Sequence, residues 1–440
     1  MPIPQIKPWL PQNAAPSLCF TNANLIDVKK GEVTSNSSIL IENGTISRVL
    51  LNSNPSHDQL DKVTSIDLQG NYICPGLIDC HVHLTANAGQ TTMRDLFAAH
   101  PNSIAYRTVW NAKQMLLRGF TTARDTGGAD YSLREAIAEG LVPGPRLFVA
   151  GKALSQTGGH GDLRAAYQGE EFKCCGGHAP GFARVCDGVP AALEAARDEL
   201  RQGVDFLKIM VGGGVASPND PLDMLQFTPE EIKAITGTAK QMGKIVTAHA
   251  YTVEAIRHAI DNGVMAIEHA NFIDAETAKL CAEKGISVTP TLSTYKGMSE
   301  PPYEEFLPPD GRVKNKRVLD SGVAALKILR DSGVNVCYGT DLLAGMHVLQ
   351  GEEFTIRSAV LSPIEILKSA TINGAKLLGM QHQLGQLEKG FIADLLILDA
   401  NPLYDITVLS RVRSQCQAIL KDGRVVYSNL SGLIPDAVYT

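Results

Sequence analysis

The stretch DFLKIMVGGGVASPNDPLDMLQFTPEEIKAITGTAKQMGKIVTAHA, residues 205–250, decides the fold. Its apolar start, residues 205–211, has the length of a buried strand. A helix is predicted over 229–243, because Thr228-Pro229-Glu230-Glu231 supplies a capping residue, a proline at the first helical position and an acidic residue three places after the cap. A second apolar segment follows and ends at Ala250. The stretch therefore predicts a strand, a helix and another strand.

The same alternation continues through the middle of the chain. Amphipathic helices separate eight candidate strands, which end near Leu84, Thr126, Leu154, Gly212, Ala250, Ala270, Leu292 and Asp341. Eight such units over about 300 residues predict a (β/α)₈ barrel of the TIM type. A doubly wound open sheet is the alternative, but no glycine-rich phosphate turn follows the first strand. The glycine run at 212–214 lacks that spacing too, so it is either a tight turn beside a ligand or a plain loop.

Both ends of the chain have strand patterns without helices between them. Four segments have this character: 18–28, 38–51, 385–402 and 418–427. The second and the fourth contain Asn43-Gly44 and Asp422-Gly423, which are typical of two-residue hairpin turns. We therefore expect residues 1–75 and 383–440 to form one small β-sandwich domain, and residues 76–382 to form the barrel.

The composition excludes several classes of protein. Of the 440 residues, 44% are hydrophobic and 20% are charged, which excludes a disordered, collagen-like or coiled-coil chain. A net charge of −6 offers no basic surface that would suggest a nucleic-acid partner. No apolar run approaches the length of about 18 residues that a membrane-spanning helix needs.

The expected location of the chain is the cytoplasm. The first 17 residues are rich in proline, and no charged region leads into an apolar segment as it would in a signal peptide. Nine irregularly spaced cysteines are typical of buried thiols in a reducing compartment.

Metal-binding residue types stand at the predicted carboxyl ends of the barrel strands, where barrels of this kind place their functional groups. In Asp79-Cys80-His81-Val82-His83-Leu84 the alternation of a strand puts both histidines on one face. His249, His269 and Asp341 end three further strands. Each of these residues alone could be structural. Together at one level of the barrel they predict a metal site.

Lys208 strengthens this prediction. If Leu207, Ile209 and Val211 pack against the helices, Lys208 points into the barrel. A lysine inside a barrel is rarely tolerated without a partner, although it could also extend to the rim or form an ion pair. With Lys208, six candidate ligands predict a binuclear site.

The order of these residues along the chain resembles the amidohydrolase superfamily. Two framing segments resemble it as well, PGLID at 75–79 and GFIADL at 390–395. Further segments resemble the binuclear branch that holds Xaa-Pro dipeptidases, related carboxypeptidase-like dipeptidases and fungal ochratoxinase: SQTGGHGD at 155–162, KIMVGGG at 208–214 and HAY at 249–251. The resemblance covers nearly the whole chain. The strand-four lysine argues against the mononuclear deaminase branch.

The resemblance implies two divalent metal ions, with zinc as the expected metal and manganese or cobalt as substitutes. A neutral Lys208 could add carbon dioxide, and the resulting carbamate would bridge the two ions. The inner ion would be bound by His81, His83 and Asp341, and the outer one by His249 and His269. Asp341 would also be the catalytic residue that takes a proton from the shared hydroxide and gives it to the leaving nitrogen.

The resemblance also implies a substrate class. In the resembling dipeptidases the residues matching His160 and Tyr251 contact the terminal carboxylate of the substrate, although either residue could be structural. The implied activity is hydrolysis of the amide bond in a small molecule, a dipeptide or an N-acyl amino acid with a free carboxylate. A cyclic-amide hydrolase and a catalytically inactive assembly protein are the alternatives. A homo-oligomer is implied too, with an octamer as one form that the resemblance suggests.

A cysteine-rich segment lies between His160 and the helix predicted from residue 190. Cys174, Cys175, His178 and Cys186 could form a zinc knuckle or a disulfide, but their spacing fits no standard zinc finger. Long loops inside compact domains are usually functional, so we expect this segment to cover the metal site as a lid.

Overall fold

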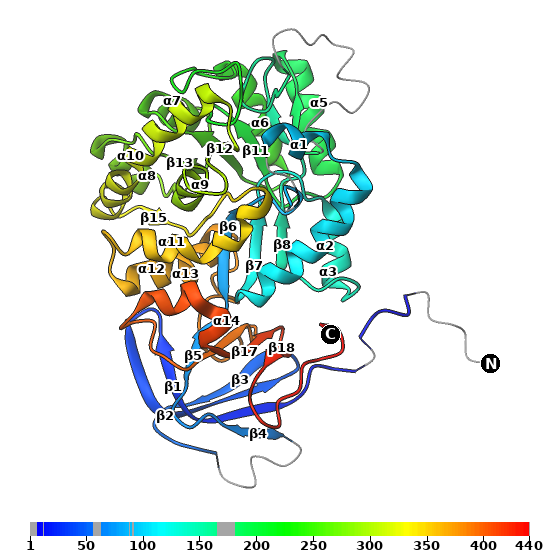
Figure 1. Ribbon diagram of the computed structural model, residues 1–440, viewed down its shortest axis with the longest axis vertical. Coiled ribbons are helices and arrows are strands. Elements are labelled where there is room, and N and C mark those ends of the chain that lie inside the picture. Colours follow the sequence, from blue (N-terminus) through cyan, green and yellow to red (C-terminus); the bar gives the residue numbers. More distant parts are fainter. Residues whose placement is uncertain are drawn as a thin grey trace, which may run out of the picture.

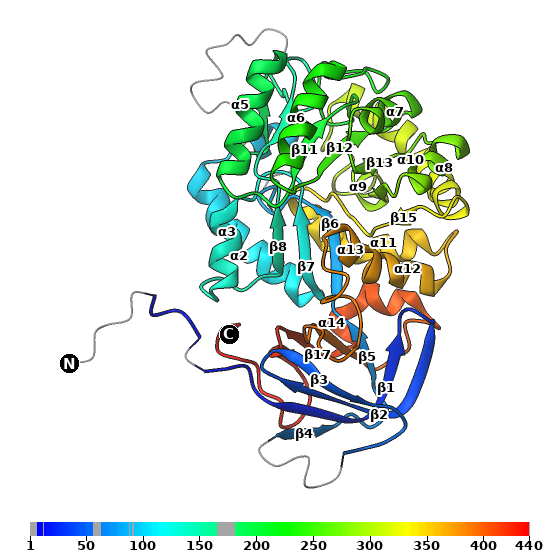
Figure 2. The same ribbon diagram turned by 180° about the vertical axis from the view of Figure 1, so that it is seen from behind.

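The structure is a computed structural model that describes residues 7–11, 13–55, 63–87, 89, 92–164 and 181–439. Figure 1 and Figure 2 show a larger part, in which helices surround strands, and a smaller part built of strands from both ends of the chain. In the described residues no helix combines the length and the apolar character needed to cross a membrane.

Two parallel sheets form the centre of the larger part. One contains β6 (Leu77–Val82), β7 (Phe120–Asp125) and β8 (Arg146–Val149) in that order. The other has the order β10-β9-β11-β12-β13-β14-β15, with the bounds Ala183–Val185, Ala153–Ser155, Leu207–Met210, Val246–Ala250, Ala266–His269, Ser287–Thr289 and Asn335–Val336. The predicted α/β class with parallel strands is confirmed.

Backbone hydrogen bonds join the two sheets at both edges. The third predicted strand is interrupted after Val149, so that its first half, β8, pairs with β7 and its second half, β9, pairs with β11. At the other edge Cys80 N donates to Tyr338 O and Asp341 N donates to His81 O, each at 2.8 Å. The parallel strands therefore follow the predicted order, but their ladder is not one continuous sheet.

Helices connect the strands and cover their outer side (Figure 1). The longer ones are α2 (Pro101–Leu117), α5 (Gly188–Arg201), α6 (Pro229–Gln241), α7 (Val253–Asp261), α8 (Ala275–Glu283) and α10 (Pro309–Asp331). The shorter ones are α1 (Met93–Ala98), α3 (Tyr131–Ala138), α9 (Leu292–Gly297), η2 (Ala344–Gly351), α11 (Glu352–Arg357), α12 (Pro363–Ser369) and α13 (Ile372–Leu377). The predicted capping box is present at the start of α6, and a second one is present at the start of α12.

Two predicted strand ends need correction. The strand expected to end near Asp341 stops at Val336. The strand expected to end near Leu292 stops at Thr289, and Leu292 begins α9. Pro290 follows Thr289 and has no N–H group with which to continue the ladder, so the chain leaves the sheet there.

Strands from both ends of the chain form one eight-stranded sheet in the smaller part. It has the order β18-β17-β16-β5-β1-β2-β3, with β4 paired to β1. The bounds are β1 Leu18–Asp27, β2 Glu32–Glu42, β3 Thr45–Leu50, β4 Thr64–Asp67, β5 Tyr72–Pro75, β16 Leu395–Leu398, β17 Cys416–Lys421 and β18 Arg424–Ser428. η3 (Ile406–Arg411) and α14 (Val412–Gln415) lie between β16 and β17.

The two predicted hairpin turns are confirmed. Asn43 and Gly44 have φ angles of 51° and 80°, and Asp422 and Gly423 have 53° and 69°. Both central residues of a type I′ turn need such left-handed angles, which asparagine, aspartate and glycine adopt most readily.

The junction of the two parts contains a partly buried ion cluster. Arg146 at the start of β8 contacts Asp394 at 2.7 Å and also contacts Asp422, both from the smaller part. Each carboxylate therefore finds a guanidinium partner across the junction, which fixes the sheet against the amino ends of the parallel strands.

The cysteines of the described residues are free thiols. Seven are present in this part of the chain and all seven are buried. This agrees with the predicted buried thiols. Cys174 and Cys175 lie outside the described residues.

Candidate metal centre

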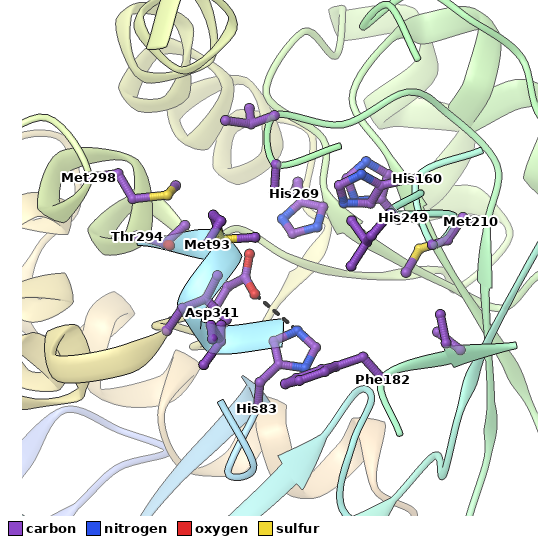
Figure 3. Close-up of a pocket in the computed structure, with 18 of the residues that line it drawn as sticks. His83, Met93, His160, Phe182, Met210, His249, His269, Thr294, Met298 and Asp341 are labelled. Carbon is purple, nitrogen blue, oxygen red and sulfur yellow. Dashed lines mark ion pairs between the residues drawn. The ribbon is translucent and has the colours of Figure 1, made fainter. Parts of the chain in front are cut away.

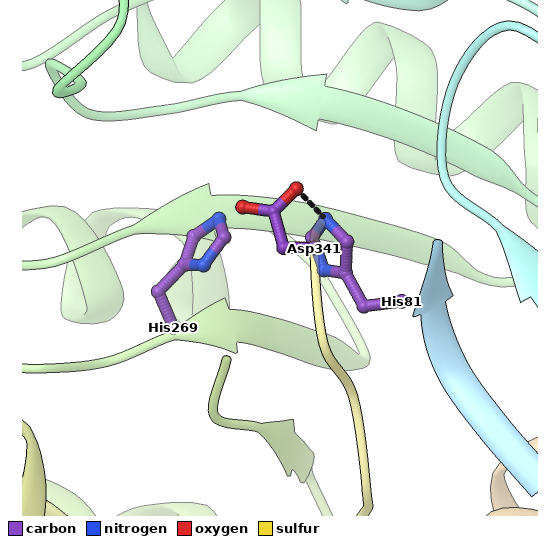
Figure 4. A group of neighbouring side chains, drawn as sticks. All are labelled: His81, His269 and Asp341. Atoms are coloured by element: carbon purple, nitrogen blue, oxygen red, sulfur yellow. Dashed lines mark ion pairs between the residues drawn. The ribbon is translucent and has the colours of Figure 1, made fainter. Parts of the chain in front are cut away.

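Histidine and aspartate side chains meet at the carboxyl ends of the parallel strands (Figure 3). His81 lies in β6 and His83 directly after it, His249 lies in β12, His269 ends β13, and Asp341 follows β15. Candidate ligand atoms of His81, His269 and Asp341 lie within 4.8 Å of one another, and Figure 4 shows the three side chains turned toward a common point. This spacing is suitable for a shared metal ion.

Asp341 lies beside the two histidines of the first barrel strand. Its Oδ1 atom is 3.3 Å from His81 Nε2 and 3.1 Å from His83 Nε2. Its φ angle of 54° is left-handed, which is uncommon outside glycine and often marks a functional position. Burial by itself would raise the pKa of Asp341, but the charges and hydrogen bonds of both imidazoles hold that pKa well below its usual value. The carboxylate is therefore anionic.

The two imidazoles near Asp341 are oriented by acceptors on their far sides. His81 Nδ1 is 2.8 Å from Glu268 Oε2, and His83 Nδ1 is 2.7 Å from Gly127 O. A carbonyl can only accept, and Glu268 is ionised because the charges of Arg124 and its other neighbours outweigh the effect of burial on its pKa. Each Nδ1 therefore donates a proton, and each Nε2 is the atom that faces Asp341 and would bind a metal ion.

The outer pair of histidines is held in the neutral form. Their ring centroids are 4.6 Å apart. His249 Nε2 is 3.1 Å from Gly213 O, and His269 Nδ1 is 2.8 Å from Thr291 Oγ1 and 3.0 Å from Tyr295 OH. Burial and the nearby basic groups hold the pKa of both imidazoles well below its usual value. Because metal ions bind the neutral ring, neither histidine has to release a proton first.

Lys208 is buried inside the larger part. Its side chain is 2% exposed, and its neighbours Leu207, Ile209 and Val211 belong to the core between strands and helices. Burial lowers the pKa of Lys208 to about 8, although the charges of Glu268 and Asp341 oppose that shift. At pH 7 roughly a tenth of the amine would be neutral, so it has reactive character that an exposed lysine lacks.

The donor set fits divalent cations. It combines imidazole nitrogens with one anionic carboxylate, and zinc, manganese and cobalt accept such nitrogen and oxygen donors. The structure thus brings the six predicted ligands to one region, and their individual roles stay predictions.

His160 packs against the outer part of the centre. Its ring stacks on that of His249 with centroids 4.2 Å apart, and its Nδ1 is 2.7 Å from Ser217 Oγ. A Cβ atom on Gly214 would lie 1.9 Å from His160 Nδ1, so only glycine leaves room for the ring. The glycine run is therefore a place of close approach. Burial lowers the pKa of His160 in spite of the nearby Asp220, which favours the neutral ring at pH 7.

Tyr251 lies two residues after His249, directly after β12, and lines the same cavity. Its side chain is 2% exposed, and its hydroxyl is 3.1 Å from the hydroxyl of Tyr295. Both tyrosines line the cavity together with His83, His249, His269 and Asp341. Burial raises the pKa of Tyr251, so its hydroxyl keeps its proton and can donate.

Comparison with known proteins agrees with this geometry. Residues 72–432 match the model of the amidohydrolase family. The chain belongs to the amidohydrolase family. It is therefore an enzyme, a hydrolase of amide bonds, and its family is generally metal-dependent.

Three related proteins show where this amidohydrolase stands within the family. Ochratoxinase of Aspergillus niger is 33% identical over 358 residues, which cover 78% of this chain and 73% of that protein. The crystal structure of a prolidase complexed with N-methylphosphonate-L-proline is 39% identical, with a TM-score of 0.89 over 94% of this chain and 100% of that one. An imidazolonepropionase of Rhizorhabdus wittichii is 26% identical over 409 residues, 85% of this chain and 92% of that protein.

The amidohydrolase site contains a glutamate that the sequence analysis missed. Glu268 is fully buried, binds His81 Nδ1, and accepts hydrogen bonds from Arg124 and Thr247. Strand alternation would put Glu268 and His269 on opposite faces, but His269 has a left-handed φ of 75°, which breaks the alternation. The available signal was an acidic residue inside an apolar strand, which is rarely buried without a partner.

Apolar side chains form much of the wall of the amidohydrolase cavity. They include Met93, Leu96, Phe182, Met210, Val215, Met298 and Leu343. The polar groups are concentrated at the metal centre, so the rest of the cavity suits an apolar portion of a ligand.

Much of the segment that was predicted to form a lid over this amidohydrolase site lies outside the described residues. Cys174, Cys175 and His178 lie outside the described residues. Cys186 is described, and burial raises the pKa of its thiol to about 12, which is unfavourable for the thiolate that binds zinc.

Proposed function

We propose that this amidohydrolase cleaves the amide bond next to a free carboxylate in a dipeptide or an N-acyl amino acid. The observation that supports the proposal most is the position of His160 and Tyr251, whose donors line the same cavity as the candidate metal ligands. The relative crystallised with N-methylphosphonate-L-proline offers support, because that compound places a tetrahedral phosphorus on the nitrogen of an amino acid with a free carboxylate.

The proposed centre holds two divalent ions, with zinc as the expected metal. Such ions supply a hydroxide nucleophile at neutral pH and polarise the scissile carbonyl. His81, His83 and Asp341 would hold one ion, and His249 and His269 the other. We propose that the neutral amine of Lys208 adds carbon dioxide and loses a proton, which leaves a carbamate able to bind both.

Asp341 is the proposed proton carrier. Its Oδ1 faces His81 and His83, so Oδ2 is the atom that would accept a proton and pass it to the leaving nitrogen. Tyr251 OH would donate to the substrate carboxylate, and neutral His160 would donate through Nε2 while Nδ1 accepts from Ser217 Oγ. The apolar wall would bind an apolar side chain of the substrate.

The substrate carboxylate gives the direct test. A hydrogen bond to a charged group contributes about 1.5–3 kcal/mol, so two of them correspond to about 10²–10⁴-fold in kcat/KM. We would compare N-acetyl-L-phenylalanine with N-acetyl-L-phenylalaninamide and score release of acetate with the zinc-loaded enzyme. His160→Ala should discriminate far less between the two compounds. Equal cleavage of both by the wild type would contradict the proposal.

A cyclic-amide hydrolase is the second candidate. The similarity to an imidazolonepropionase over 85% of the chain favours it, at 26% identity. If the wild type ignored the free carboxylate, cyclic amides would be the next substrates to screen.

We further infer a closed (β/α)₈ barrel over residues 76–382 and a small β-sandwich domain of residues 1–75 and 383–440. The hydrogen bonds that join β8 through β9 to β11, and Cys80 to Tyr338, support the closure. A homo-oligomer and a cytoplasmic location stay predictions.

A further inference from the structure

A second large cavity lies at the junction of the two parts, away from the metal centre. It has a volume of about 550 Å³ and is bounded by α2, η2, η3 and α14. Arg118 ends α2 just before the amino end of β7, whereas the metal centre lies at the carboxyl ends of the strands. The residues that line the two cavities do not overlap.

The walls of this junction cavity combine cations with apolar groups. Arg118, Arg411 and Arg413 contribute guanidinium groups, and none of the described residues that line the cavity is acidic. The apolar lining consists of Trp110, Phe120, Val348, Leu409 and Val412. Two of these side chains are unusually exposed for their type, Trp110 at 52% and Val348 at 65%.

The three arginines differ in how far their charge is compensated. Arg411 contacts the carboxylate of Asp405 at 3.4 Å. Arg413 donates to the neutral Gln114, and Arg118 donates from Nε to the neutral Gln350 at 2.8 Å. Neither of those two contacts neutralises a charge.

Arg118 is the least satisfied of the three. Its Nη2 atom is buried and has no hydrogen-bond partner among the described residues. Burial and the positive charge of Arg413 lower the pKa of Arg118 to about 10, although the charge of Asp79 opposes that shift. A buried cation is stable only when an opposite charge and hydrogen-bond acceptors are supplied, and a bound anion would supply both.

We propose that the junction cavity is a binding site for an organic carboxylate with an apolar body, held by the guanidinium groups of Arg118 and Arg413. Planar guanidinium groups match carboxylate oxygens in geometry and charge. The apolar wall would pack against the body of the ligand, which an inorganic phosphate lacks. The site is independent of the proposed function, because no residue of the metal centre lines it.

The test uses Trp110 as a reporter within the cavity. The chain has two tryptophans, and Trp9→Phe leaves Trp110 as the only one. Hexanoate, which does not absorb at the excitation wavelength, would be titrated into this variant while the emission of Trp110 is followed. We expect a saturable change with hexanoate, a much weaker one with phosphate and none with hexanamide, which has the same apolar body without the charge.

Two arginine variants in the Trp9→Phe background show whether the guanidinium groups bind the ligand. Arg118→Gln and Arg413→Gln should each weaken hexanoate binding by about 10-fold or more, because each removes a charge-assisted contact. Arg317→Gln, at an exposed position on α10, is the matched control and should bind as before. Arg413→Gln also covers the case in which Arg118→Gln fails to fold.

Three results would overturn the proposal. The first is no saturable response to hexanoate, and the second is an equal response to hexanamide. The third is an emission that depends on protein concentration and not on hexanoate, which would assign this face to a contact between copies of the chain. Repeating the titration in His81→Ala separates the two sites, because the response of Trp110 should persist there even if the proposed amide hydrolysis is wrong.

Discussion

This amidohydrolase contains two ion clusters, one at the junction and one around the candidate metal centre, in which similar side chains have different roles. At the junction, Arg146 pairs with Asp394 and Asp422, and the pKa of Asp422 falls to about 2 because Arg146 and Lys421 outweigh the effect of burial. Arg146 and Asp422 are both held in their charged forms there.

Around the candidate metal centre, three basic groups are shifted toward their neutral forms. Lys208, His249 and His269 all have lowered pKa values, because burial and mutual repulsion disfavour their charged forms. The junction therefore consists of ion pairs, whereas burial around the candidate metal centre favours the neutral forms of these three bases, which are the forms that bind metal.

The largest effect on metal content and turnover is expected for a substitution of Lys208, which belongs to the candidate metal centre and not to the junction. The wild type should hold about two divalent ions per chain, and Lys208→Ala should lose metal and activity together because the proposed bridge is gone. Metal analysis and turnover would be measured, with the exposed Lys316→Ala as the control. Bicarbonate should speed reloading of metal-free wild type but not of Lys208→Ala. Full metal content and turnover in Lys208→Ala would refute the bridge.

A smaller loss is expected for Asp341→Asn, which keeps the shape but removes the base. kcat should fall by at least about 10²-fold, while KM changes much less. Metal content must be measured alongside, since Asp341 is also a candidate ligand. A kcat within a few-fold of wild type, with metal retained, would mean that another residue moves the proton.

Glu268→Gln and Asp394→Asn form a matched pair, one variant in each cluster. Glu268→Gln should lower metal affinity or kcat by about 10–100-fold, because it removes the negative charge beside His81 and leaves one oxygen where two accept hydrogen bonds. Asp394→Asn should lower the free energy of unfolding by about 1–3 kcal/mol and leave kcat within about two-fold. Urea unfolding and metal titration would measure both. If both variants lowered metal affinity equally, the conclusion that only one of the two clusters supports metal binding would be wrong.

The smallest effect concerns acid stability at the junction. The pKa of Asp422 in the folded protein, about 2, lies below its usual 3.8, so its contribution to stability is present above about pH 4 and is lost as the pH falls toward 2. Asp422→Asn should flatten the stability profile in this window. Its side chain is 45% exposed, so solvent screening keeps the effect small. If the free energy of unfolding of Asp422→Asn depended on pH in the same way as that of the wild type, Asp422 would not contribute to the loss of stability in acid.

Strand alternation and strand ends in the sequence predict the side chains that the structure brings together in the candidate metal centre. His81, His83, Lys208, His249 and Asp341 come from periodic or strand-end positions, and the parallel strands bring those positions to one edge.

What the sequence could not show depends on local departures from regular structure. Regular alternation puts Glu268 on the same face as His249, and the left-handed backbone of His269 brings its imidazole to that face as well. The interruption after Val149 divides one predicted strand into two. The junction cavity could not be predicted from the sequence either, because Arg118 and Arg413 are far apart in the chain and line the same cavity only in the folded protein.

The pairing of β5 with β16 has a consequence for synthesis of the chain. Pro75 lies opposite Leu395, and about 320 residues separate them in sequence. At about 5–20 residues per second a ribosome needs roughly 15–65 s to make the intervening segment. For that time the apolar edge of β5 has no partner from the carboxyl-terminal strands, and it is open to wrong pairing. The nascent chain is therefore expected to depend on chaperones until β16 emerges.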